Sequence, residues 1–136
     1  MINRVARASS RSGLGPVWEL TTTGHRSGEP RTVPVAPIEV EGSRYLVAAY
    51  GIVGWVQNVR ASGTAKLAQG RTRQAIAVEE VDAEEAGRIL AAYYPLYAVV
   101  VSQQFDLPRD PTAEDFAAAS MQHPVFRVTR NLQADR

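Results

Sequence analysis

A chain of 136 residues fits a single domain, since single domains cluster near about 100–150 residues. Its net charge of +1, with 21% charged residues, excludes strongly basic nucleic-acid-binding proteins and acidic solvating proteins, so electrostatic recognition must be local. The absence of cysteine excludes disulfides, thiolate nucleophiles, cysteine zinc sites and iron–sulfur ligation, and it fits a reducing cytoplasm.

The N-terminal segment, residues 1–15, is expected to form an arm ahead of the domain. It has no apolar core of the length that a signal peptide needs. Its three arginines at helix-like spacing have few apolar neighbours, so we expect at most weak peripheral contact with a membrane. The longest apolar run, residues 93–101, is far shorter than the roughly 20 residues of a spanning helix. These features predict a soluble, cytoplasmic domain over residues 1–136.

The first two predicted strands flank a turn-rich loop. Residues 17–23 alternate as a strand does, residues 24–30 have turn chemistry at nearly every position, and residues 31–40 predict the return strand. Pro34 and Pro37 each remove a donor from the hydrogen-bond ladder. The return strand is therefore expected at a sheet edge or with a bulge.

The loop between these strands gathers cations. His25, Arg26 and Arg31 lie in or next to it, and Gly24 and Gly28 permit backbone conformations that point N–H groups inward. Guanidinium forks suit phosphate or carboxylate oxygens. From the residue types alone, two interpretations stay open: an anion-binding site, or a solvated hairpin tip with ordinary surface arginines.

The middle of the chain predicts a buried strand and a short helix. Residues 44–50 include the run YLVAAY, which is apolar on both faces. Ala48 and Ala49 in that strand leave room for a flat ring beside it. Residues 55–61 then predict a helix with one apolar face, closed by Ser62-Gly63.

The C-terminal half predicts a hairpin, two helices and a last strand. The clearest helix, residues 82–94, has an apolar stripe, starts at a capping-box-like Asp82 and Glu85, and is expected to end at Pro95. Residues 97–109 fit either a strand, from their valine run, or a helical or lid segment. The remaining predictions are strands over 64–69, 71–81 and 125–130, a helix over 110–121 and a disordered tail over 131–136.

About six strands with inserted helices, and no regular βαβ alternation, predict a small, mainly antiparallel β-barrel with α additions. No internal repeat is visible.

Tyr93, Tyr94 and Tyr97 could line a ligand pocket or form part of the core, and residue type favours the core.

Several common catalytic motifs are absent from the sequence. Residues 13–15 lack the third glycine of a dinucleotide fingerprint, and Gly28 is not followed by the Lys-Ser/Thr of a P-loop. The two histidines, His25 and His123, have no carboxylate at ligand spacing, so we expect no metal site. No nucleophile elbow supports a Ser-His-Asp hydrolase.

Three segments, taken in order and at this spacing, resemble one family. LTTTGHRSGEPRTVP (20–34), YLVAAYG (45–51) and GWVQNVRASG (54–63) are similar to the deazaflavin-dependent nitroreductases and F420H2-dependent quinone reductases. The resemblance covers about residues 17–97. It implies a split β-barrel of the FMN-binding, pyridoxamine-phosphate-oxidase-like type, with about six antiparallel strands. It also implies coenzyme F420, a deazaflavin hydride carrier with a phosphate and an oligoglutamate tail.

The resemblance assigns cofactor roles to individual residues. Arg26 and Arg31 would bind the anionic tail and phosphate, the backbone at 32–34 would meet the polar edge of the deazaflavin, and small residues at 48–49 would allow close approach of its ring. Two residues of the 55–61 helix would close over the cofactor. The implied cofactor-binding set is His25, Arg26, Arg31, Thr32, Val33, Pro34, Ala48, Ala49, Tyr50, Trp55 and Asn58.

The sequence departs from the family pattern at two places. Family members usually carry a Ser-Lys-Gly-Gly stretch and a longer insertion before the tryptophan, whereas residues 50–54 here are shorter and lack lysine. One tail contact is therefore missing. Tyr97 matches one of the tyrosines that shape the acceptor pocket in nitroreducing members, but Val100 stands three residues later. This implies a more apolar acceptor site and does not imply nitroimidazole reduction.

The implied function is an oxidoreductase that transfers a hydride from reduced F420 to a small planar electron-poor acceptor, such as a quinone, an enone or a nitroaromatic. Tyr50 or Tyr97 would donate a proton or orient the acceptor carbonyl. Two alternatives stay open: a non-catalytic binder of a flavin-like or apolar ligand, and an FMN-dependent oxidoreductase of the same barrel type. The expected partners are the small-molecule acceptor and a second copy in a homodimer, with no nucleic acid.

Overall fold

A computed structural model describes residues 16–132 of the chain. The strands are β1 (Trp18–Thr23), β2 (Pro30–Val35), β3 (Ile38–Val40), β4 (Ser43–Val47), β5 (Thr64–Gln69), β6 (Thr72–Glu80) and β7 (Val125–Asn131). The helices are α2 (Gly54–Ser62), α3 (Ala83–Val101), the 3₁₀ helix η1 (Ser102–Gln104) and α4 (Ala113–Ala119). The expected arm over 1–15 lies outside the described residues, as do residues 133–136 of the expected tail. Asn131 is not part of such a tail, because it ends β7.

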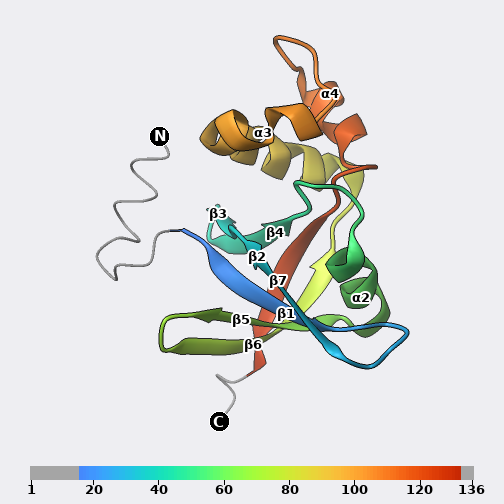
Figure 1. The fold of residues 1–136 in the computed structure, drawn as a ribbon. Helices are drawn as coiled ribbons and strands as arrows, with labels where there is room; N and C mark the ends of the chain where they lie inside the picture. The colour runs from blue at the N-terminus through green and yellow to red at the C-terminus, as the bar shows by residue number, and fades with distance from the viewer. Residues whose placement is uncertain (1–15, 133–136) are drawn as a thin grey trace.

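The strands form one antiparallel sheet in the order β2-β1-β5-β6-β7-β4-β3. The two edge strands, β2 and β3, are consecutive in the chain and are joined only by Ala36 and Pro37. The sheet must therefore curl until its edges come together, as Figure 1 shows. The predicted barrel and the predicted edge position of β2 are confirmed. The expected return strand over 31–40 is two strands, because the chain breaks at the Ala36-Pro37 link.

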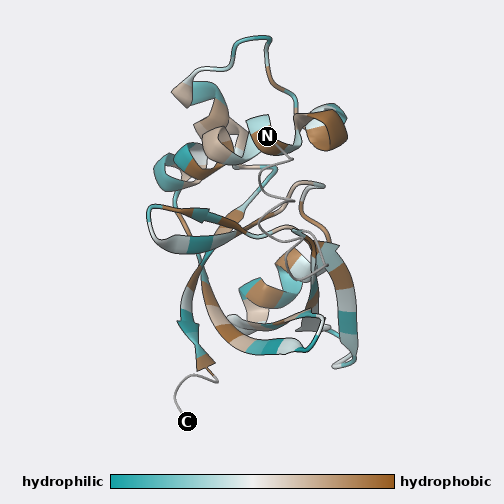
Figure 2. Ribbon diagram, turned by 90° about the vertical axis from the view of Figure 1, so that its left-hand side faces the viewer, coloured by the Kyte–Doolittle hydropathy of each residue, from teal (hydrophilic) through white to brown (hydrophobic). Residues whose placement is uncertain are grey.

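One part of the core lies within the curl of the sheet, where α2 is seated (Figure 2). Alternating strand residues point inward, and those that are almost fully buried include Leu20, Leu46, Leu67, Ile76 and Phe126. Helix α2 adds its apolar face to them, with the Trp55 ring centroid 5.6 Å from that of Phe126. The helix ends at Gly63, whose φ of +76° is the left-handed conformation that glycine adopts most easily.

A second part of the core packs α3 and α4 against β3, β4 and β7, at the end of the sheet where Figure 1 shows these two helices together. The two helices approach closely at Gly87, where an added Cβ would lie 2.9 Å from the backbone nitrogen of Ala117. Helix α4 begins with a capping box formed by Thr112 and Asp115. No helix among residues 16–132 is long and apolar enough to cross a bilayer.

Glu85, in the first turn of α3, ties this helix to the sheet. Its Oε2 accepts a hydrogen bond from the Tyr45 hydroxyl at 2.9 Å and from Arg127 at 2.6 Å. The Arg127 guanidinium, helped by Tyr45, lowers the pKa of Glu85, so this carboxylate stays ionised. The predicted cap at Asp82 is confirmed, since its side chain accepts the Glu85 N–H, but the Glu85 carboxylate contacts the sheet.

The predicted end of this helix at Pro95 is wrong, because α3 continues to Val101. A proline inside a helix costs roughly 3 kcal/mol. Continuing the helix places Tyr97 and Val101 one and two turns beyond Tyr93, and these side chains pack against the core while Pro95 faces solvent. Burial of this stripe offsets the lost hydrogen bond. Of the two interpretations of residues 97–109, the helical one holds for the first part of the segment.

Candidate functional site

The loop between β1 and β2 is held by its own backbone. The Gly24 N–H donates to the Glu29 carbonyl at 2.8 Å, and the Gly28 N–H donates to the Gly24 carbonyl at 2.9 Å. Gly28 has a φ of +76°, and a Cβ at Gly24 would lie 2.6 Å from Ser27 Oγ. Gly28 therefore has the left-handed conformation that glycine adopts most easily, and a side chain at position 24 would displace the Ser27 hydroxyl.

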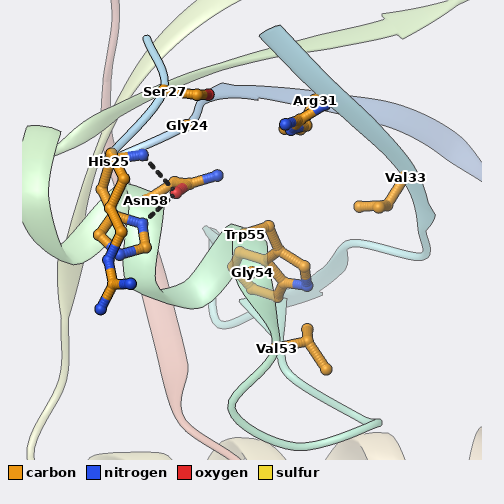
Figure 3. Close-up of a pocket in the computed structure, with 10 residues that line it drawn as sticks. Gly24, His25, Ser27, Arg31, Val33, Val53, Gly54, Trp55 and Asn58 are labelled. Carbon is orange, nitrogen blue, oxygen red and sulfur yellow. Dashed lines mark hydrogen bonds between the residues drawn. The ribbon is translucent and has the colours of Figure 1, made fainter. Parts of the chain in front are cut away.

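Asn58, on α2, holds the same loop through hydrogen bonds to His25. Its Oδ1 lies 2.8 Å from the His25 backbone nitrogen and 2.8 Å from His25 Nδ1, as the dashed lines in Figure 3 show. A backbone N–H only donates, so the atom facing it must be the amide oxygen. The amide Nδ2 then donates to Thr22 Oγ1 at 2.9 Å, and His25 Nδ1 must carry a proton. This leaves Nε2 as the ring nitrogen not engaged by Asn58.

A pocket of about 410 Å³ opens between this loop and α2 (Figure 3). We call it the cationic pocket; its lining residues are Gly24, His25, Arg26, Ser27, Arg31, Val33, Val53, Gly54, Trp55 and Asn58. Neither Arg26 nor Arg31 makes an ion pair or a side-chain hydrogen bond with any residue in the described range. Two guanidinium groups without carboxylate partners, at the rim of one hollow, suit an anionic ligand.

A second pocket, of about 550 Å³, adjoins the first. We call it the apolar pocket; its lining residues are Val17, Val33, Pro34, Val35, Ala36, Val47, Ala49, Tyr50, Val53, Trp55, Tyr93, Tyr97, Val100 and Val101. Val33, Val53 and Trp55 line both pockets. The two pockets therefore adjoin at these three residues, one with a cationic lining and the other with an apolar lining, and we call the two together the groove. Such a groove suits a ligand with a flat apolar part and an anionic part.

Three tyrosines of graded exposure line the apolar pocket. Tyr93 is buried, Tyr97 is half-buried and Tyr50 is exposed. The rings of Tyr93 and Tyr97 pack with their centroids 4.7 Å apart. Burial raises the pKa of Tyr93, and the neighbouring Tyr97 and Tyr50 raise it further; burial also raises the pKa of Tyr97. Both phenols therefore stay protonated at neutral pH and can donate hydrogen bonds.

The groove brings together most of the residues expected to bind the cofactor. Those that line one or both pockets are His25, Arg26, Arg31, Val33, Pro34, Ala49, Tyr50, Trp55 and Asn58, together with Tyr97. The other two, Thr32 and Ala48, line neither pocket. The Thr32 hydroxyl pairs with that of Thr21 at 2.8 Å on an exposed part of the sheet, which leaves the expected contact through the Thr32 backbone a prediction. Ala48 is 1% exposed within the core.

Tyr93 lines the site without having been assigned to it. For this residue a pocket position and a core position were both open, with the core favoured, and the structure places it in both the core and the apolar pocket. His123 is buried, stacks on Phe105 with ring centroids 3.8 Å apart, and donates from Nδ1 to the Ala48 carbonyl at 2.9 Å. Within residues 16–132 no group of His, Asp and Glu side chains is arranged to hold a metal ion.

Comparison with solved structures confirms the predicted split-barrel fold. An F420-H2 dependent reductase, FDR-A, shares 25% identity, with 83% of this chain and 93% of that chain covered and a TM-score of 0.53. A NimC/NimA family protein from Clostridium acetobutylicum shares 16% identity over 94% of this chain and 81% of its own, with a TM-score of 0.60. A structure described as a domain-swapped dimer shares 22% identity, with 93% of this chain and 91% of that chain covered and a TM-score of 0.55. The last two show the fold alone.

A search of curated proteins found no match. A family profile described as F420H(2)-dependent quinone reductase, however, matches residues 3–106. This confirms the family resemblance in the glycine- and arginine-rich loop, and nothing in the comparisons supports the FMN alternative. Since the match spans most of the chain, the protein is a reductase that belongs to the F420H2-dependent quinone reductase family.

Proposed function

We propose that this reductase binds reduced F420 along the groove and passes a hydride to a small planar electron-poor acceptor, such as a quinone or an enone. The observation that carries the proposal is the junction of the cationic and apolar pockets through Val33, Val53 and Trp55. A cofactor with a flat ring at one end and an anionic tail at the other matches that polarity.

The cationic pocket fits the tail and phosphate. Arg26 and Arg31 make no ion pair with other described residues, so their guanidinium forks are available for phosphate or carboxylate oxygens. Residues 50–54 contribute Val53 and Gly54 to the lining but no cation. The two arginines would therefore hold the tail without the lysine that other family members carry in this segment.

The apolar pocket fits the ring and the acceptor. Ala36 and Ala49 leave open space in its wall, and its apolar lining would keep water from the reacting atoms. When bound, F420 supplies the hydride chemistry, so the protein contributes position and hydrogen bonds. Tyr50 lies at the exposed side of this pocket and Tyr97 lies deeper, and either hydroxyl would reach an acceptor carbonyl from its own side.

We further propose that the protein works in the cytoplasm as a homodimer. The cysteine-free composition supports the compartment. A structural relative described as a domain-swapped dimer supports the assembly. Light scattering coupled to size-exclusion chromatography would measure the mass, with twice 14.8 kDa expected and a monomer mass contradicting the dimer.

The proposed activity is tested by mixing the protein with reduced F420 and menadione and following the return of F420 fluorescence. We expect reoxidation that depends on both the enzyme and menadione. A parallel series with an enone and a nitroaromatic would define the acceptor class. Saturable F420 binding without turnover in any of these mixtures would instead favour the non-catalytic binder.

A further inference from the structure

The apolar pocket has very few polar side-chain atoms. Among its described lining residues, these atoms are the indole N–H of Trp55 and the hydroxyls of Tyr50, Tyr93 and Tyr97. Tyr93 is the most deeply placed tyrosine of the three, with 5% of its surface exposed. Its ring belongs to the core beside Val47 and Ala49, which also line the pocket. The ring position is therefore fixed by packing.

The Tyr93 hydroxyl makes no hydrogen bond to any residue between 16 and 132. In the same range, no side-chain nitrogen or oxygen is both fully buried and without a partner. The hydroxyl must therefore reach a solvent-accessible space, and the space that Tyr93 lines is the apolar pocket. Tyr45 differs in this respect, because the hydroxyl of that buried tyrosine donates a hydrogen bond to Glu85 at 2.9 Å. Tyr93 keeps a donor available for a ligand.

The protonation state of Tyr93 fits a donor and not an acid catalyst. Burial and the neighbouring tyrosines raise its pKa, and no Asp, Glu, Lys or Arg is among the described residues that line this pocket. A phenol in such surroundings retains its proton, and it can donate a strong hydrogen bond to the oxygen of a ligand that displaces water from the pocket.

We propose that the Tyr93 hydroxyl donates a hydrogen bond to a carbonyl oxygen of the acceptor and thereby selects carbonyl acceptors over those without oxygen. This rests on the proposed function. Overall, reduced F420 loses two electrons and two protons, and a quinone gains them to become the hydroquinone. As the hydride arrives, negative charge grows on the acceptor oxygen, and the Tyr93 hydroxyl stabilises it without giving up its own proton. Tyr97 packs on the Tyr93 ring and holds it in place.

The test compares Tyr93→Phe with Tyr94→Phe. Tyr94 lies on the same helix but packs edge-on against Phe105 and Phe116, outside the lining of the apolar pocket, so its variant is a matched control. Two hydride acceptors are used. Menadione has carbonyl oxygens, whereas N-methylphenazinium has no oxygen atom. We expect kcat/KM with menadione to fall about 10- to 100-fold in Tyr93→Phe only. The rate with N-methylphenazinium and the affinity for F420 should stay within about twofold of the wild type.

The outcomes separate this proposal from the proposed function. Wild-type protein that reduces neither acceptor would contradict the proposed function itself. An active wild type with an unchanged Tyr93→Phe, or with equal losses for both acceptors, would overturn the Tyr93 assignment alone. If Tyr93→Phe does not fold, 3-fluorotyrosine at position 93 retains the shape and strengthens the donor; a faster reaction with menadione only is expected, and an unchanged rate would overturn the assignment.

Discussion

Asn58 Oδ1 accepts both hydrogen bonds that His25 can offer it, from the backbone N–H and from Nδ1, each at 2.8 Å. The same amide donates to Thr22 Oγ1 in β1. One buried side chain of α2 thus joins the helix, the first strand and the start of the arginine loop. The shape of the cationic pocket depends on this junction, because His25 and Asn58 both line it.

Replacing Asn58 with leucine should therefore weaken both the fold and the pocket. Asn58→Leu retains the branched shape of the side chain but leaves the His25 N–H and the Thr22 hydroxyl without partners, at a cost of about 1–3 kcal/mol for each unsatisfied group. Urea unfolding should show this loss, and F420 titration should show weaker binding. Asn58→Asp is the control: it retains an oxygen for His25 and accepts from Thr22, so it should lose less. Equal stability of Asn58→Leu and the wild type would contradict this role.

The ionised Glu85 should make stability depend on pH. Arg127, aided by Tyr45, holds the pKa of Glu85 below its ordinary value in the folded protein. A group with a lowered folded pKa stabilises above its unfolded pKa and loses that contribution as pH falls through the folded value. Glu85→Gln should therefore reduce the free energy of unfolding at pH 7, and the difference from wild type should shrink below about pH 4. Chemical denaturation at pH 7 and pH 3 would measure it.

Glu41→Gln provides the comparison for that experiment. Glu41 pairs with Arg88 at 3.2 Å, but the two side chains are 78% and 53% exposed. Exposed pairs contribute about 0–1 kcal/mol, so this variant should change little at either pH. If Glu85→Gln behaved like Glu41→Gln, the attachment of α3 through Glu85 would be refuted.

The contact of α3 with α4 at Gly87 should resist even one added methyl group. A Cβ there would meet backbone atoms of Ala117 at 2.9 and 3.0 Å. Gly87→Ala gains up to about 1 kcal/mol of helix propensity but should lose about 1–3 kcal/mol to overpacking. The net expected result is a lower Tm by thermal denaturation. At Gly54, a Cβ would meet nothing within 4 Å, so Gly54→Ala should be neutral or stabilising, and a Tm for Gly87→Ala that matched it would contradict the prediction.

The barrel and its edge strand could be predicted because their causes are local. Alternating apolar residues mark the strands, and Pro34 and Pro37 forbid a central position for the return strand. The end of α3 was predicted wrongly for the same reason. The rule that proline ends a helix is local, whereas the burial of Tyr97 and Val101 that carries the helix past Pro95 comes from distant strands.

The candidate site could be predicted only in part. The cations of the loop are visible in the sequence, and the family resemblance implies that they bind the anionic part of F420. The partners of Asn58 lie 33 and 36 residues away, so its hydrogen bonds could not be read from the sequence. The one available signal was an amide on the buried face of a short helix. The sequence did not decide whether Tyr93 lies in the core or lines a pocket. A buried tyrosine can do either, and the two are told apart by the hydrogen-bond partner of its hydroxyl, which only the structure shows.

The central claim is that Arg26 and Arg31 hold the anionic part of F420. The most direct measurement is fluorescence titration of F420 with the wild type, the double variant Arg26→Gln/Arg31→Gln, and Arg109→Gln, which changes an exposed arginine outside both pockets. Hydrogen bonds to charged groups contribute about 1.5–3 kcal/mol each, so the double variant should bind at least about 100-fold more weakly, with its fold intact by circular dichroism. Arg109→Gln should bind as the wild type does. Wild-type affinity in the double variant would contradict the account.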